Sequence, residues 1–105
     1  MNESEFNQRV DETLEHIEDA LNDCDADLDW DLVGGILTIV CPNGSQVIIN
    51  RQGPSKQIWV AARSGGYHFD YNDETDQWQQ GELELIALLN QSLSEQSGET
   101  VSLAV

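Results

Sequence analysis

The sequence predicts an α+β fold, a two-layer sandwich in which one N-terminal and one C-terminal helix pack on one face of a five- to six-stranded antiparallel sheet. Apolar residues recur with helical spacing near both ends, β-branched runs fill the middle, and turn residues separate those runs at short intervals. A chain of 105 residues with 39% hydrophobic content supports one core and is too short for two. We therefore expect a single domain over residues 1–105.

The first helix is expected over residues 4–23. Its apolar residues are spaced four, four, three and four positions apart, which is the period of an amphipathic helix: Phe6, Val10, Leu14, Ile17 and Leu21. On the opposite side of this helix fall Asp11, Glu15, Glu18, Asp19 and Asn22. The helix should therefore bury one side and present acids on the other.

The strands are expected to form an antiparallel meander. Gly34-Gly35 and residues 42–45, 52–55, 64–66 and 72–76 are typical turns, and they separate strands predicted over residues 36–41, 46–50, 57–63, 67–71 and 77–79. With a period of two, Leu37 and Ile39 face one way with Ile58 and Val60. The alternate positions include Asn50, Gln52 and Trp59.

A second helix is expected from residue 83, after Gly81, and Ser97-Gly98 should end it. Two helices on one face of the sheet leave the other face to water or to a partner. A Trp among Asn and Gln on such a face suits a partner anchor, because it offers large contact area and a polar N–H. The alternative is that Trp59 only covers the sheet.

Charge is partitioned along the chain. Residues 1–31 hold twelve of the twenty acids and one base, whereas residues 32–69 hold no acid and three bases. The middle of the chain should therefore supply a second surface of neutral or basic character. We call the following set the acidic ridge: Asp11, Glu15, Glu18, Asp19 and Asp23 on the helix, then Asp25, Asp27, Asp29 and Asp31 at alternate positions of an extended segment.

Like charges three or four residues apart on a helix each cost a few tenths of a kcal/mol. Folding alone would not select this pattern, although a solubilising face remains the alternative. Carboxylates suit iron, magnesium, calcium or manganese rather than structural zinc. An EF-hand is excluded, since its glycine position is Trp30 and its final glutamate position is Ile36.

Other function classes are disfavoured. His16 lies beside the acidic ridge on the first helix, and His68 lies in a strand with no Ser, Cys or paired carboxylate placed for nucleophilic work. No phosphate-binding glycine motif is present. The acidic N-terminal segment has no secretory or transit character, and we expect a cytoplasmic protein with Cys24 and Cys41 as reduced thiols. A net charge of -16 and the lack of a long apolar stretch argue against membranes and nucleic acid as partners.

Three segments together resemble bacterial frataxin: residues 48–54 (IINRQGP), 57–61 (QIWVA) and 65–70 (GGYHFD). The resemblance extends over essentially the whole chain, including the acidic first helix and Trp78 before the second helix. It implies a monomer of the sandwich fold that binds ferrous and ferric iron weakly at the surface, with other divalent cations and iron-dependent oligomers as further expectations. It also implies a regulator of iron-sulfur cluster biogenesis, and a possible iron donor, that contacts the cysteine desulfurase and the scaffold protein.

The resemblance carries over by residue. Positions that match the family's acidic ridge are Glu18, Asp19, Asp23, Asp25, Asp27, Asp29 and Asp31, and we add Glu15 to these expected metal ligands. The expected partner-binding residues are Asp11, Glu18, Asp19, Asn50, Gln52 and Trp59. Asn22 stands where an acid is expected and Asn7 offers no imidazole, which puts a metal site at either position in doubt.

Two other functions stay open at this point. A ferroxidase or iron-storage activity at the ridge would need a defined two-metal site, and the lack of a His ligand beside closely held carboxylates speaks against it. An acidic mimic of a polyanion is the third possibility. We therefore expect a protein that is not an enzyme.

Overall fold

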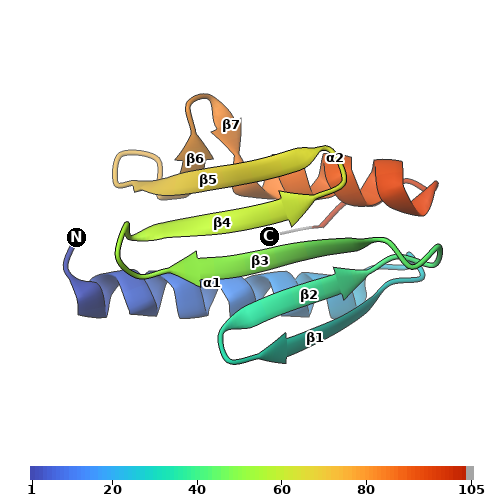
Figure 1. Ribbon diagram of the computed structural model, residues 1–105, viewed down its shortest axis with the longest axis horizontal. Helices are drawn as coiled ribbons and strands as arrows, with labels where there is room; N and C mark the ends of the chain where they lie inside the picture. The colour runs from blue at the N-terminus through green and yellow to red at the C-terminus, as the bar shows by residue number, and fades with distance from the viewer. Residues whose placement is uncertain (104–105) are drawn as a thin grey trace.

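A seven-stranded antiparallel sheet lies against two helices in the computed structural model, which describes residues 1–103 (Figure 1). The strands are hydrogen-bonded in sequence order, and both helices lie behind the sheet in this view. The elements in chain order are α1 (Glu3–Asp23), β1 (Asp29–Val33), β2 (Ile36–Val40), β3 (Gln46–Gln52), β4 (Gln57–Ala62), β5 (Gly65–Asn72), β6 (Gln77–Gln80), β7 (Leu83–Glu84) and α2 (Leu85–Ser97). The predicted two-layer sandwich is confirmed.

Helix α1 begins with a capping contact and buries one side. The side chain of Asn2 accepts a hydrogen bond from the Glu5 amide at 2.8 Å, which satisfies one of the unpaired N–H groups at the helix start. The buried residues are the predicted apolar series with Ala20 added: Phe6, Val10, Leu14, Ile17, Ala20 and Leu21. No basic residue lies in the last turn, which ends with the acid Asp23.

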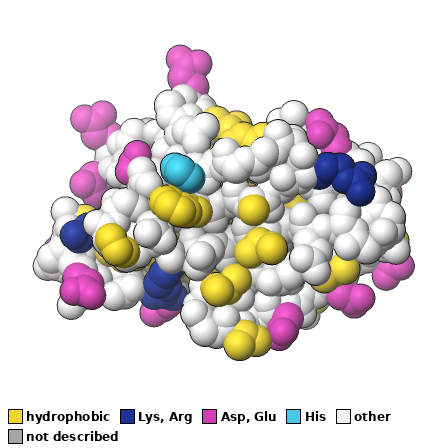
Figure 2. All heavy atoms as spheres, in the orientation of Figure 1, with side chains coloured by type: hydrophobic (Ala, Val, Ile, Leu, Met, Phe, Trp, Pro, Cys, Tyr) yellow, Lys and Arg dark blue, Asp and Glu magenta, His cyan; other side chains and the backbone are white. Residues whose placement is uncertain are grey.

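The register of the sheet decides which residues face the helices. Leu37 pairs with Ile49, Ile49 with Val60 and Ile58 with Phe69, and all of these are buried under α1 and α2. Their neighbours along each strand point to the opposite side, which we call the open face. Figure 2 views this face, where hydrophobic side chains gather along the middle and acids lie toward the rim.

The sheet has more strands than the five or six predicted. The strand β1 forms one edge, where the sequence indicated an extended segment before Gly34, and β7 at the other edge is the added strand. Gly81 adopts a left-handed conformation with φ of 61°, which turns the chain back so that Leu83 pairs with Gln80. Helix α2 consequently begins at Leu85 rather than at residue 83, with the Glu84 side chain capping it by accepting from Ile86 and Ala87 amides.

A buried amide joins the end of α2 to the sheet. Gln96 donates to the Ser45 hydroxyl and the Gln46 carbonyl, both at 3.2 Å, and accepts from the Arg63 amide at 2.9 Å. Only 5% of Gln96 is exposed, so these bonds satisfy an amide that water does not reach. After α2 ends at Ser97, with Gly98 as its C-cap, the chain returns to the core, where Val101 and Leu103 are buried.

Candidate functional site

The helical part of the acidic ridge lies along the solvent side of α1. Asp11, Glu15, Asp19 and Asp23 are exposed, and Glu18 is half-buried. Among residues 1–103, the one ion pair joins Asp11 to Arg51, so no cation of the described chain pairs with the other ridge carboxylates. The C-terminal half of α1 therefore carries uncompensated negative charge.

The remainder of the ridge has a different orientation. Asp25 and Asp27 are exposed in the link after α1, whereas Asp29 and Asp31 lie on β1. Asp31 pairs with Thr38, which belongs to the open face, so Asp29 and Asp31 also project to that side of the sheet edge. Within the described part of the chain, no three His, Cys, Asp or Glu side chains are grouped closely enough to hold a metal ion.

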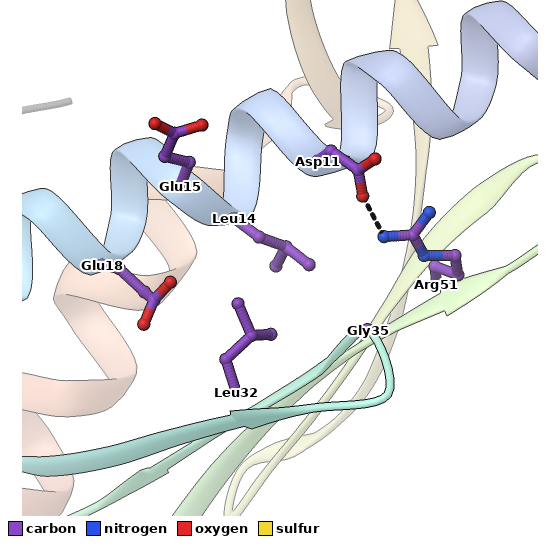
Figure 3. Close-up of a pocket in the computed structure, with 7 residues that line it drawn as sticks. All are labelled: Asp11, Leu14, Glu15, Glu18, Leu32, Gly35 and Arg51. Carbon is purple, nitrogen blue, oxygen red and sulfur yellow. Dashed lines mark hydrogen bonds and ion pairs between the residues drawn. The ribbon is translucent and has the colours of Figure 1, made fainter.

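Arg51 connects the sheet to the acidic helix. It lies at the end of β3 on the helix side, donates to Asn7 Oδ1 at 2.9 Å and forms an ion pair with Asp11 (Figure 3). Asn7, where the family resemblance raised doubt about a metal ligand, is thus used as an acceptor for this guanidinium. No sequence pattern indicates this contact, because 40 residues separate Arg51 from Asp11.

A hollow of about 420 Å³ adjoins this ion pair, between α1 and the β1–β2 hairpin. Its lining comprises Asp11, Leu14, Glu15, Glu18, Leu32, Gly35 and Arg51. In Figure 3 the side chains of Leu14 and Leu32 point toward one another, Asp11 and Glu18 point toward the hairpin, and Glu15 points away from it. The hollow thus has an apolar centre with a carboxylate near each end.

The open face carries the second candidate surface. Asn50 pairs with Trp59 and Trp59 with His68, while Gln52 pairs with Gln57, so the three predicted residues Asn50, Gln52 and Trp59 lie together. The Trp59 and His68 rings stack with centroids 4.3 Å apart and planes 15° apart. His68 was not among the partner-binding residues predicted from the sequence. Period-two alternation with an antiparallel register would have placed it opposite Trp59.

The polar atom of Trp59 already has a partner within the chain. Its indole Nε1 donates to Gln57 Oε1 at 2.9 Å, and Gln57 Nε2 donates to Asp70 Oδ1 at 3.1 Å. The open face is also less neutral than predicted, since Asp70 lies at one side of it and Asp29 and Asp31 at the other. Trp59 is thereby held in one orientation and remains half-buried, with its exposed surface available for contact.

An aromatic cluster fastens the start of α1 to β5 and β6. Tyr71 packs edge-on against Trp78 at 5.2 Å between ring centroids, and the Arg9 guanidinium lies 5.0 Å from the Tyr71 ring centre. Burial raises the pKa of the Tyr71 hydroxyl above its ordinary value of 10.0, and its 3.0 Å hydrogen bond to Asp76 adds to this effect. This cluster positions the ridge relative to the sheet.

Of the two thiols, Cys24 is half-buried and Cys41 is buried, and both are free. Neither α1 nor α2, the helices within residues 1–103, combines the length and apolarity needed to cross a membrane. His16 is exposed on α1 and lines a second hollow of about 350 Å³ beside Asp76 and Glu84, where Glu84 is occupied in capping α2.

Comparison with known proteins places these features in context. A family model described as a frataxin-like domain matches residues 1–99. The iron-sulfur cluster assembly protein CyaY of Pseudomonas aeruginosa is 50% identical over 103 residues, which cover 96% of this chain and 95% of that protein. The protein of the same name from Tolumonas auensis is 47% identical, covering 98% and 99% of the two chains.

Solved structures show the same likeness. The frataxin of Psychromonas ingrahamii superposes with a TM-score of 0.89 at 36% identity, covering 100% of both chains. Yeast frataxin superposes with a TM-score of 0.68 at 26% identity, covering 88% of this chain and 80% of its own.

Proposed function

Because this chain belongs to the frataxin family, we propose that it acts in iron-sulfur cluster assembly as an iron-binding regulator in the cytoplasm. In this role, the acidic ridge takes up ferrous or ferric iron weakly and also docks on the cysteine desulfurase. The open face around Trp59 contacts the scaffold protein. The observation that carries the proposal is the uncompensated charge along the C-terminal half of α1.

That charge is unfavourable in two ways. Glu18 and Asp19 lie three and four residues after Glu15, where like charges repel. The C-terminal end of a helix carries partial negative charge and favours cations, yet Asp19 and Asp23 lie there and the last turn holds no base. Any bound cation relieves both costs, whether it is a metal ion or a basic side chain of a partner.

Weak metal binding is the form of binding that this surface supports. The ridge carboxylates are spread along α1 and β1, and the described residues offer no cluster of three ligands for one ion. A hard cation at such a surface keeps most of its water and exchanges readily. Iron and a basic partner can therefore compete for the same carboxylates, which suits a regulator whose contacts respond to iron supply.

The test compares two triple variants that remove the same number of negative charges. Glu18→Ala with Asp19→Ala and Asp23→Ala removes three ridge acids, whereas Asp73→Ala with Glu74→Ala and Glu82→Ala removes three exposed acids elsewhere. We expect the ridge variant to lose desulfurase binding by calorimetry and most ferrous-iron shifts in anaerobic NMR, and the control variant to keep both. Equal losses of desulfurase binding and iron shifts in the two variants would show that the ridge acts only through nonspecific charge, which would contradict the proposal.

An enzymatic role is the alternative. The relatives are named assembly proteins, and a ferroxidase would need two metal ions held by shared carboxylates. Saturable oxygen consumption with ferrous iron, abolished by single ridge substitutions, would favour that alternative over a regulator. The names of the relatives favour a role in assembly, so we propose a protein that is not an enzyme.

A further inference from the structure

The turn between β2 and β3 contains a chemically labile pair of residues. Asn43 is the one asparagine of the chain that precedes a glycine, Gly44, and both residues are exposed to water. Glycine has no side chain to shield its backbone nitrogen, so that nitrogen can approach the carboxamide carbon of the preceding asparagine. Spontaneous deamidation is therefore expected at this pair before any other asparagine of the chain.

The turn occupies the nitrogen that would attack. The Gly44 N–H donates to the Cys41 carbonyl at 2.9 Å, and the Cys41 N–H donates to the Ser45 carbonyl at 2.8 Å. Gly44 has φ of 86°, as in a three-residue hairpin loop that ends in a left-handed glycine. The Gly44 nitrogen must leave its hydrogen bond and lose its proton before it can react.

The carboxamide of Asn43 is held at both of its polar atoms. Its Oδ1 accepts from the Ser45 amide at 3.0 Å and from the Ser45 hydroxyl at 2.7 Å. Its Nδ2 donates to the Gln96 carbonyl at 2.7 Å, across 53 residues of sequence. Attack on the Asn43 Cγ requires this side chain to turn toward Gly44, which breaks these bonds.

The same side chain fastens α2 to the sheet. The Gln96 carbonyl lies in the last turn of α2, where helix carbonyls lack a partner within the helix, and Asn43 satisfies it. In Figure 1 the β2–β3 turn and the end of α2 lie at the same end of the molecule. We call the contacts among Asn43, Ser45 and Gln96 the α2 joint.

We propose that Asn43 is a deamidation site which the α2 joint keeps closed, and that its conversion releases the end of α2 from the sheet. The Gly44 nitrogen gives its proton to hydroxide and bonds to the Asn43 Cγ. The Cγ–Nδ2 bond then breaks, and Nδ2 takes a proton from water and leaves as ammonia. Water adds to one carbonyl of the resulting succinimide, which leaves aspartate or isoaspartate at position 43.

A carboxylate at position 43 cannot maintain the α2 joint. It has no proton to donate to the Gln96 carbonyl. It also places negative charge beside the C-terminal end of α2, where the helix dipole is itself negative. The proposal uses neither the acidic ridge nor Trp59, so it is independent of the proposed function.

The first experiment follows the conversion itself. The folded protein is incubated in warm, mildly alkaline buffer, and peptide mass spectrometry measures replacement of NH₂ by OH at each asparagine. The unfolded reference is the peptide acetyl-Pro-Asn-Gly-Ser-amide. We expect Asn43 to convert before the other asparagines and more slowly than the peptide. Earlier conversion of another asparagine, or a rate equal to that of the peptide, would overturn the proposal.

Two serine variants test whether the α2 joint sets the rate. Ser45→Ala removes the hydroxyl that donates to Asn43 and accepts from Gln96. Asn43 should then convert about fivefold faster, which corresponds to roughly 1 kcal/mol of lost hydrogen bonding. Ser64→Ala is the matched control, because this exposed serine lies in the β4–β5 turn and bonds to Tyr67. Equal conversion rates in the two variants would contradict control by the α2 joint.

A third comparison tests the consequence for α2. Asn43→Asp reproduces one product, and Asn72→Asp makes the same change in the β5–β6 turn, where Asn72 accepts from the Glu74 amide. We expect Asn43→Asp to speed hydrogen exchange of amides 95–98 at least about fivefold, since one hydrogen bond is lost. Asn72→Asp should leave that exchange unchanged, and amides 58–60 should stay protected in both variants. Parent-like exchange of amides 95–98 in Asn43→Asp would show that conversion does not release α2.

Discussion

The indole of Trp59 and the imidazole of His68 stack on the open face with ring centroids 4.3 Å apart. The two residues are cross-strand partners on β4 and β5, so the sheet register itself brings the rings together. A hydrogen bond from the Trp59 Nε1 to Gln57 fixes the indole from its other end. The exposed part of Trp59 is therefore a rigid surface, which lowers the entropy cost of binding a partner.

Substitution of Trp59 should affect binding more than folding. We expect Trp59→Ala to weaken binding of the scaffold protein at least tenfold by calorimetry, as for a central aromatic anchor. His68→Ala should weaken this binding about threefold, because the stack with Trp59 is lost. Val40→Ala lies on the same face, opposite Asp29 at its far side, and should leave affinity unchanged. Equal affinities for Trp59→Ala and Val40→Ala would mean that Trp59 only covers the sheet.

The two glycines of the β1–β2 turn should differ in their tolerance of alanine. Both have positive φ, 61° at Gly34 and 78° at Gly35, so each alanine costs about 1 kcal/mol in backbone strain. At Gly35 the new Cβ would also lie 3.1 Å from Arg51 Nε, whereas nothing lies within 4 Å at Gly34. We expect urea unfolding to show Gly35→Ala as the less stable variant by about a further 1 kcal/mol.

A double-mutant cycle identifies the source of that difference. Arg51→Gln should remove the added cost of Gly35→Ala, and it should leave the cost of Gly34→Ala unchanged. Additive effects at Gly35 and Arg51 would contradict a contact between them.

Alkaline pH should destabilise the protein through Tyr71. The folded protein holds the Tyr71 proton more tightly than the unfolded chain, whose pKa is near 10.0. The resulting stabilisation is complete below that pH and is lost as pH rises through the higher pKa of the folded state. Thermal unfolding from pH 8 to 11 should therefore show a steeper loss for the parent than for Tyr71→Phe.

The same comparison at neutral pH isolates the hydroxyl contact. Tyr71→Phe should be less stable there, because it lacks the hydrogen bond to Asp76, so that the two stability curves converge as pH rises. Parallel curves across the alkaline range would show that Tyr71 does not titrate with folding.

Removal of the buried Gln96 amide should loosen the joint between α2 and the sheet. Gln96→Ala leaves the Arg63 amide and the Gln46 carbonyl without their partner, which we expect to cost about 2 kcal/mol in urea unfolding. Gln96→Met, of similar size, should lose nearly as much if hydrogen bonding dominates. Gln91→Ala, exposed on the same helix, is the matched control and should stay within about 0.5 kcal/mol of the parent.

Much of the fold follows from short-range patterns in the chain. The helical spacing from Phe6 to Leu21 predicted α1 to within one residue, because a single buried side requires that period. Gly34-Gly35 and Gly98 predicted a turn and a helix end, because left-handed backbone favours glycine. The strand β7 was missed, since two paired residues leave no periodic signal.

The sequence by itself determined two helices on an antiparallel sheet, an acidic outer side for the first helix, and Trp59 among polar residues on the open face. Each of these depends on neighbours within a few positions, where helix and strand geometry act directly. Only the tertiary structure decided that Arg51 meets Asp11, that His68 stacks on Trp59, and that Leu14 and Leu32 face one hollow. Those contacts join residues far apart in sequence, so they depend on sheet register and layer packing rather than on local pattern.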